Sequence, residues 1–174
     1  MSGEYYHLYN RGNSKQEIFN DAEDYHRFMA LLYTCNSGKN FRMSLVKEGA
    51  EKDPYLWERE NQIVSIGAYC LMPNHFHLLV TEKEDGGASK FVQKLSTAYV
   101  MYRNIKYERT GGLFEGKFKS EHLDTDQYLK YIFSYIHLNP LKLIQKNWKE
   151  DGIKNKKASL NYLYIYRYSS YLDF

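Results

Sequence analysis

The sequence predicts an α+β protein with a ferredoxin-like (RRM-like) antiparallel sheet, helices on one face of it and an added C-terminal helix. Three observations support this fold class. Strand-like and helix-like segments follow one another as strand, helix, strand, strand, helix, strand, helix, which is a split βαβ unit plus one helix. The composition, 43% hydrophobic and 26% charged, is globular. A length of 174 residues favours one domain spanning 1–174 with a substantial core.

The first strand and the first helix lie near the start of the chain. Residues 5–10 are rich in strand formers and are followed by a turn signal at 11–13. Between 21 and 34, apolar and aromatic residues recur at helical spacing behind an acidic first turn. The polar stretch 36–61 shows little pattern. We interpret it as an insertion or long loop, which could contain a small hairpin at 43–46.

A hairpin and a second helix follow this stretch. Residues 63–71 and 75–81 are two apolar runs, and the Met-Pro-Asn sequence at 72–74 separates them. Such a pair predicts a β-hairpin. From 89 to 107, apolar side chains again recur at helical spacing, and the glycine pair at 111–112 ends the pattern.

The last part of the chain predicts one strand, one helix and a second possible strand. Residues 113–123 have the pattern of a short strand. A helix begins near 124–126, where Asp and Thr side chains can cap it, and it ends before Pro140. In the tail, residues 162–168 alternate tyrosine with other residues, so we expect an edge strand that presents several rings on one face.

Composition and charge exclude several classes of protein. The two cysteines, Cys35 and Cys70, stand alone, which excludes a disulfide framework and fits a reducing compartment. No apolar run approaches the roughly 18 residues of a membrane span. The start of the chain lacks the pattern of a secretory signal, so we expect a cytoplasmic protein. Residues 1–100 carry 11 basic and 13 acidic side chains (−2), and residues 101–174 carry 13 and 8 (+5). An anionic partner would therefore favour the C-terminal part.

The His75-Phe76-His77 sequence is the first candidate for chemistry. In a strand, residues i and i+2 point to the same face about 6.6 Å apart, so the two imidazoles can converge on one metal ion while Phe76 packs on the opposite face. The alternative is a pair of half-buried histidines in a hairpin. The motif alone does not decide between these interpretations.

The second candidate is a stripe along the C-terminal helix. Tyr128, Tyr131, Tyr135 and Asn139 follow one another at i, i+3, i+7 and i+11, which is one face of a helix. Such a stripe is more often packed core than catalytic. However, asparagine is a poor core residue unless its amide is hydrogen-bonded. Pro140 restricts the backbone of Asn139, so the presence of an asparagine at this position needs an explanation.

Together the two candidates form a coherent site. Two imidazoles and an amide oxygen could hold a divalent cation while leaving positions open for phosphate oxygens. The ligand types would suit Mg²⁺ or Mn²⁺, and the imidazoles would also accept Zn²⁺. A neighbouring phenol could then attack a phosphodiester, since the cation would stabilise the developing charge.

These motifs resemble those of the single-tyrosine HUH transposases, and most closely the REP-associated tyrosine transposases and their insertion-sequence relatives. The resemblance covers most of the chain outside 36–61. It rests on six segments in the family's order: 7–12 (HLYNRG), 71–80 (LMPNHFHLLV), 90–99 (KFVQKLSTAY), 113–120 (LFEGKFKS), 135–140 (YIHLNP) and 168–171 (YSSY).

The resemblance implies a role for each site residue. His75 and His77 would be metal ligands, Asn139 the third ligand, and Mg²⁺ or Mn²⁺ the cofactor. Tyr135 would attack a single-stranded DNA phosphate and form a 5′-phosphotyrosine link. The partner would be single-stranded DNA with hairpin elements, and the chain would act in DNA transposition as a monomer or as a homodimer. Tyr128 and Tyr131 are rival nucleophiles, but only Tyr135 begins the YIHLNP segment.

Basic side chains interleaved with aromatic ones could hold the DNA. Cations neutralise phosphates, and tyrosine or phenylalanine rings offer stacking faces for unpaired bases. The candidates are Arg11, Lys90, Lys94, Arg103, Lys117 and Lys119. The alternative for each is a solvated charged face. Two other functions also fit the sequence: a non-catalytic nucleic-acid-binding module, and a phosphoesterase that uses water while Tyr135 only packs.

Overall fold

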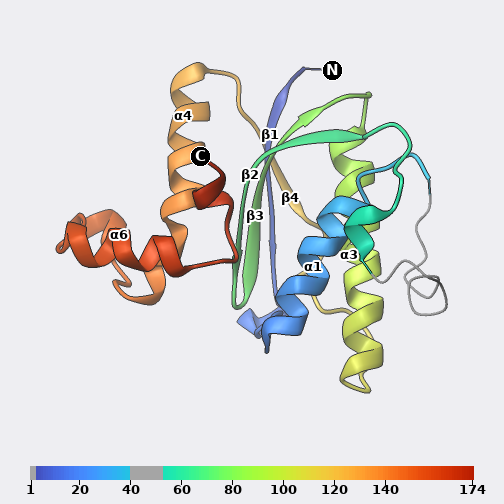
Figure 1. The fold of residues 1–174 in the computed structure, drawn as a ribbon, viewed down its shortest axis with the longest axis horizontal. Coiled ribbons are helices and arrows are strands. Elements are labelled where there is room, and N and C mark those ends of the chain that lie inside the picture. Colours follow the sequence, from blue (N-terminus) through green and yellow to red (C-terminus); the bar gives the residue numbers. More distant parts are fainter. Residues whose placement is uncertain (1–2, 40–52) are drawn as a thin grey trace.

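A single four-stranded antiparallel sheet organises the computed structural model, which describes residues 3–39 and 53–174 (Figure 1). Its strand order is β2-β3-β1-β4. The strands are β1 (Tyr5–Arg11), β2 (Val64–Met72), β3 (His75–Glu82) and β4 (Lys119–His122). The helices are α1 (Ala22–Thr34), α3 (Gly87–Lys106), α4 (Asp126–Leu138), α5 (Trp148–Asp151) and α6 (Lys156–Ile165). Short 3₁₀ turns are η1 (Asn13–Lys15), η2 (Pro54–Leu56), η3 (Asn139–Leu143) and η4 (Ser170–Asp173).

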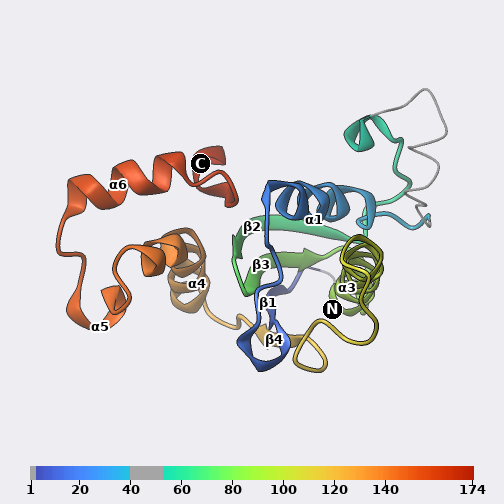
Figure 2. The same ribbon diagram turned by 90° about the horizontal axis from the view of Figure 1, so that it is seen from below.

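Helices α1 and α3 cover one face of the sheet (Figure 2). Alternate strand residues point to this face, so Leu8 of β1 and Phe76 and Leu78 of β3 are fully buried against Phe28 of α1 and Leu95 of α3. A fully buried aliphatic or aromatic side chain contributes about 1.5–3 kcal/mol. This layer is therefore the main core. It confirms the ferredoxin-like fold class and the inward orientation expected for Phe76.

Helix α4 packs on the opposite face of the sheet, away from α1 and α3 (Figures 1 and 2). Thr125 caps its N-terminus by accepting a hydrogen bond from the backbone N–H of Tyr128. Ile132 and Ile136 then pack against Cys70 and Leu79 of the sheet in a second, smaller cluster. The histidines that alternate with Phe76 along β3 consequently face α4.

The strand register determines which side chains meet on the α4 face. Across the β1–β3 pair, Tyr9 lies opposite His77 and Arg11 opposite His75. Across the β1–β4 pair, His7 lies opposite Glu121. Opposite residues in antiparallel strands bring their Cβ atoms to about 4.5–5.5 Å, and diagonal neighbours remain within reach of long side chains. The register therefore gathers histidines, tyrosines and one carboxylate from three strands.

The predicted edge strand at 162–168 is wrong. Most of this stretch lies in α6, where Asn155 caps the helix by accepting from the backbone N–H of Ala158. The chain reaches the β2 edge only afterwards: the N–H of Leu71 donates to the carbonyl of Tyr168, and Ser169 forms an isolated bridge with Cys70. A favourable cap and helical packing therefore outweigh the period-two pattern of tyrosines.

Two further segments refine the predictions. Strand β4 is confined to four residues, so Lys117 precedes it, and Gly116 turns the chain with a positive φ of 73°. The hairpin considered at 43–46 lies outside the described residues. In the described part of the chain, no helix has the length and apolar character needed to cross a membrane.

Candidate active site

Strand β3 places His75 and His77 on the face that α4 covers. The centres of the two imidazole rings are 5.0 Å apart, and the rings are nearly perpendicular, at 87°. His77 is only 6% exposed. The two rings thus lie close enough for their nitrogens to approach a common ligand.

Helix α4 delivers Tyr135 and Asn139 to the same place. The Tyr135 ring lies edge-on to the His77 ring, with 5.3 Å between centres. Asn139 begins η3, one helical turn beyond Tyr135, and is 1% exposed. Its amide lies beside His75 and acts to raise the pKa of that imidazole, against the larger opposite effect of burial. Residues more than fifty positions apart in the chain therefore form one cluster.

The cluster contains buried polar atoms that lack protein partners. Among the described residues, none makes a hydrogen bond to His77 Nε2 or to either polar atom of the Asn139 amide. Nearly all buried polar groups in folded proteins are paired, so such atoms call for a ligand. Two imidazoles and an amide oxygen match the donor set of a divalent cation. The residues present therefore fit the metal that the sequence motifs imply.

The orientation of His75 supports the same interpretation. Its Nδ1 lies 2.6 Å from the side-chain oxygen of Asn74, which accepts its hydrogen, so Nε2 keeps its lone pair. The described residues contain no group of three His, Cys, Asp or Glu side chains arranged for a metal ion. The third protein ligand in this cluster would thus be the Asn139 amide.

The electrostatics keep the imidazoles neutral. Burial, with the charges of Lys142 and Arg11, lowers the pKa of His75 to about 4. Burial is also the main cause that holds the pKa of His77 well below its usual value, and Lys142 and Lys149 act in the same direction. A metal ligand must offer a lone pair, and both rings can do so at neutral pH.

Three residues that the motifs did not single out complete the cluster. His7 of β1 is 4% exposed, and its Nε2 lies 2.9 Å from His77 Nδ1. Glu121 of β4 lies on the far side of His7. Lys149 of α5 places its ammonium nitrogen 3.7 Å from the centre of the Tyr135 ring. The HLYNRG segment indicated that the first strand matters, but no local pattern linked it to His77. Lys149 carried no signal at all.

The three tyrosines of the α4 stripe differ in their surroundings. Tyr128 donates a hydrogen bond of 2.8 Å to Glu121. Tyr131 is 54% exposed and stacks between the other two rings, with centres 6.4 Å from Tyr128 and 6.3 Å from Tyr135. Of the three, Tyr135 makes ring contacts with both His7 and His77.

Comparison with known proteins agrees with this geometry. The family model described as IS200-like transposase matches residues 56–139, a range that includes His75, His77, Tyr135 and Asn139. The resemblance to IS200-like transposases is confirmed. Over residues 56–139 the chain is therefore similar to transposases of the IS200 type.

Two solved structures are similar to the chain. One is a REP-associated tyrosine transposase bound to a REP hairpin, with a TM-score of 0.56 at 13% identity, over 99% of this chain and 78% of that one. The likeness shows a common fold. The other is a candidate transposase from Deinococcus radiodurans R1, with a TM-score of 0.45 at 15% identity, over 78% of this chain and 90% of that one. No curated protein matches the chain in sequence.

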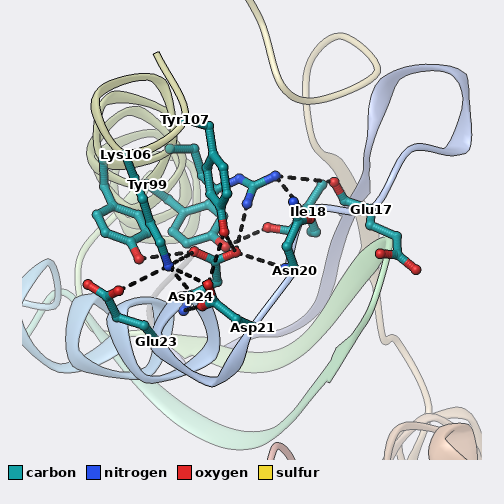
Figure 3. Close-up of polar contacts among 11 residues, drawn as sticks. Glu17, Ile18, Asn20, Asp21, Glu23, Asp24, Tyr99, Lys106 and Tyr107 are labelled. Carbon is teal, nitrogen blue, oxygen red and sulfur yellow. Dashed lines mark hydrogen bonds and ion pairs between the residues drawn. The ribbon is translucent and has the colours of Figure 1, made fainter. Parts of the chain in front are cut away.

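The structure contradicts one of the DNA contacts predicted for this transposase-like chain. Arg103 is 2% exposed, and its guanidinium forms a 2.7 Å ion pair with the buried carboxylate of Asp24. Lys106 and Tyr107 also bind Asp24, and Figure 3 shows this carboxylate at the centre of the network. Arg103 is therefore a structural residue between α1 and α3, out of reach of any DNA phosphate.

The other five predicted DNA contacts fall into two groups. Lys90 and Lys94 lie on α3, across the sheet from the histidines; Lys90 pairs with Glu84, and Lys94 donates to backbone carbonyls, including that of Ser37 at 2.6 Å. The other three are exposed on the strands and turn nearest the site: Arg11, Lys117 and Lys119. Only this second group is near the candidate chemistry.

Proposed function

We propose that the chain is a metal-dependent transposase that cleaves and rejoins single-stranded DNA at hairpin-bearing sites through a 5′-phosphotyrosine at Tyr135. One observation carries the proposal: His77 Nε2 and the Asn139 amide have no hydrogen-bond partner among the described residues, and the Tyr135 ring lies 5.3 Å from the His77 ring, centre to centre. The family match over residues 56–139 supports the same reaction class.

The metal ligands would be His75, His77 and Asn139. A divalent cation held there, Mg²⁺ or Mn²⁺, would polarise the scissile phosphate and stabilise the charge that develops on it. The neutral imidazoles leave the full positive charge of the cation available to the phosphate. The buried Asn139 amide would add a neutral oxygen ligand. A carboxylate at the same place would bring a negative charge that repels the DNA phosphate.

Tyr135 would be the nucleophile. Its phenol loses a proton to solvent as Oη bonds to phosphorus, the bond from phosphorus to the 3′ oxygen breaks, and that oxygen takes up a proton to become a free 3′-hydroxyl. One phosphodiester replaces another, so the link can be reversed by a second 3′-hydroxyl without ATP. Rejoining to a different strand would complete a transposition step.

The surroundings of the rival tyrosines favour this choice. The Tyr128 hydroxyl donates a hydrogen bond to Glu121. Tyr131 is exposed to solvent and stacks on the rings of Tyr128 and Tyr135. Of the three tyrosines on the α4 stripe, Tyr135 is the one that combines ring contacts to the histidines with a cation against its ring, that of Lys149. An unpaired base could stack on the exposed ring of Tyr131.

DNA would be held by cations around the site. Lys119 lies 6.0 Å from the centre of the Tyr9 ring, and Lys142 and Lys149 contribute positive charge felt by His77. Arg11 lies opposite His75 in the sheet. Because the similar REP-associated transposase was solved with a REP hairpin, we propose a hairpin as the substrate here as well.

The test is incubation of the chain with hairpin-bearing single-stranded DNA and Mg²⁺ or Mn²⁺, followed by denaturing electrophoresis. We expect a covalent protein–DNA adduct that EDTA prevents and that Tyr135→Phe abolishes, while the matched control Tyr131→Phe retains it. An adduct that survives in Tyr135→Phe would refute the nucleophile. Cleavage without any adduct would indicate a phosphoesterase that uses water, and salt-sensitive binding without cleavage would indicate a binding module.

A further inference from the structure

A line of polar contacts runs from β4 through β1 to His77. Tyr9 and Tyr128 each donate a hydrogen bond of 2.8 Å to the Glu121 carboxylate. The nearer Glu121 oxygen faces His7 Nδ1 at 3.5 Å, an ion-pair distance, and Nδ1 makes no hydrogen bond to any other described residue. On the other side of the same ring, His7 Nε2 is 2.9 Å from His77 Nδ1. The line ends at His77 Nε2, which has no partner among the described residues.

The Glu121 carboxylate, at the start of this line, determines which nitrogen of each imidazole carries the hydrogen. An ionised carboxylate can only accept hydrogens, so the His7 nitrogen facing it carries the N–H. In a neutral imidazole the other nitrogen is then an acceptor. His77 must therefore donate its Nδ1–H to His7 Nε2, which leaves the lone pair of His77 on Nε2, the atom that faces the ligand cluster.

We propose that Glu121 and His7 are positioning residues that hold His77 in the Nδ1–H tautomer, with the Nε2 lone pair directed at a divalent cation. The inference deepens the proposed function and rests on it, since that function assigns a cation to His75, His77 and Asn139. Glu121 and His7 do not bind the cation themselves. They act through His77, as carboxylate and carbonyl groups behind metal-binding histidines commonly do.

The environment keeps Glu121 in the acceptor state that this arrangement needs. Burial raises its pKa, but the hydrogen bonds from Tyr9 and Tyr128 and the proximity of His7 more than offset this and leave the pKa below its ordinary value. The Tyr9 hydroxyl binds one carboxylate oxygen, and the Tyr128 hydroxyl binds the other, the oxygen that also faces His7. An amide at position 121 would have to present its NH₂ group to one of these three neighbours.

The opposite tautomer of His77 could not bind the cation. If His7 presented an Nε2–H to His77, the Nδ1 of His77 would become the acceptor and its Nε2 would carry a hydrogen instead of a lone pair. The metal ligand would then be blocked without any change in the position of the ring. Loss of such a supporting group typically weakens metal affinity by about 10- to 100-fold.

The test uses the full chain without DNA and has two readouts. Long-range ¹H–¹⁵N correlation spectra of the metal-free protein report which nitrogen of His77 is protonated, and calorimetric titration with Mn²⁺ reports affinity. We expect the Nδ1–H tautomer in the wild type. Glu121→Gln and His7→Phe should each weaken Mn²⁺ binding roughly 10- to 100-fold. His7→Gln, whose amide oxygen can still accept from His77, should recover much of that loss.

His122→Gln is the matched control, because this histidine neighbours Glu121 on β4 but pairs with Glu4 at the surface. It should bind Mn²⁺ as the wild type does. The inference is overturned if His77 is protonated on Nε2 in the wild type, or if His7→Phe binds Mn²⁺ as tightly as His7→Gln while melting cooperatively. Normal tautomer and Mn²⁺ results without a DNA adduct would refute the tyrosine chemistry and leave this inference standing.

Discussion

The ammonium nitrogen of Lys149 lies 3.7 Å from the centre of the Tyr135 ring. The lysine comes from α5 and the tyrosine from α4, so the contact depends on the turn η3 between these helices. In the proposed reaction, this positive charge would lie beside the phenol that a phosphate approaches. A cation there can stabilise both the approaching phosphate and the charge that builds up during phosphoryl transfer.

Replacement of Lys149 should therefore slow adduct formation. We expect Lys149→Met to reduce the single-turnover rate roughly 10- to 100-fold, because a preorganised charge near the reacting phosphate is lost. The rate can be measured as the appearance of covalent adduct at saturating DNA. Lys146→Met, an exposed lysine in the preceding turn, is the control. Equal rates for the two variants would exclude a role for Lys149 in the reaction.

The Asn139 amide has no hydrogen-bond partner among the described residues. Its replacement by an apolar side chain should therefore stabilise the metal-free chain and weaken metal binding. Asn139→Leu should raise the free energy of unfolding of the metal-free chain by about 1–3 kcal/mol, since a buried polar group without a partner is removed. The same variant should lose the stabilisation that Mn²⁺ provides, which is about 2.7 kcal/mol at a hundredfold excess over Kd. Chemical denaturation with and without Mn²⁺ measures both effects.

Asn36 provides the matched comparison for this prediction. It is also buried, but its side-chain oxygen accepts from the N–H groups of Ile63 and Val64, and its NH₂ donates to a carbonyl at 2.9 Å. Asn36→Leu should destabilise the chain because it leaves backbone groups unpaired. If Asn139→Leu destabilised the metal-free chain to the same extent, the idea that its amide awaits a ligand would fail.

The buried histidines predict a loss of stability as the pH falls. In the unfolded chain a histidine takes up a proton near pH 6.5, whereas folded His75 does so only near pH 4. Stability is therefore constant above pH 6.5 and decreases below it. The decrease is about 1.4 kcal/mol per pH unit for each histidine that must remain neutral. The pKa values of His7 and His77 are lowered as well, so they steepen the slope.

Denaturation of the metal-free chain between pH 6.5 and 5 would measure this slope, above the range where most carboxylates titrate. His75→Gln should reduce the slope by about one proton taken up on unfolding. A free energy of unfolding that stays flat across this interval would contradict the neutral, buried state of the three imidazoles.

The ion pair between Asp24 and Arg103 predicts a large effect on stability far from the site. Asp24→Asn should cost about 3–5 kcal/mol, because it leaves the buried guanidinium of Arg103 without its counter-charge. Asp21→Asn is the control: Asp21 also pairs with Lys106 in this network, but its side chain is 50% exposed, where an ion pair contributes about 1 kcal/mol or less. Asparagine would also keep the cap of α1. Thermal melts of the two variants make the comparison, and similar melting temperatures would show that the buried Asp24–Arg103 pair contributes little.

Much of the fold and part of the site follow from local patterns in the sequence. The period-two pattern of β3 predicted that His75 and His77 share a face and that Phe76 points to the other, as the structure confirms. Helical spacing brought Tyr135 and Asn139 together. These relationships involve residues two to four positions apart, and backbone geometry alone determines them. The unusual place of an asparagine before Pro140 was also visible from the sequence.

Other features depend on contacts between distant segments. The sequence could not show that Arg103 is buried, because its partner Asp24 lies 79 positions away and a lone arginine is usually exposed. The helical position of Tyr162 and Tyr164 was missed for a different reason, because the period-two pattern was given more weight than the local cap at Asn155. The alignment of Glu121, His7 and His77 arises from pairing of three strands, and Lys149 reaches Tyr135 only through a turn.

The sequence by itself determined the order of elements as far as α4, the face on which His75 and His77 lie and the four residues proposed for chemistry. Only the tertiary structure decided which residues support those four and which cations are exposed near them, Arg11 being paired there with Glu115. The physical reason is that secondary structure follows from short-range periodicity, whereas the protonation and orientation of His77 depend on strand register and burial.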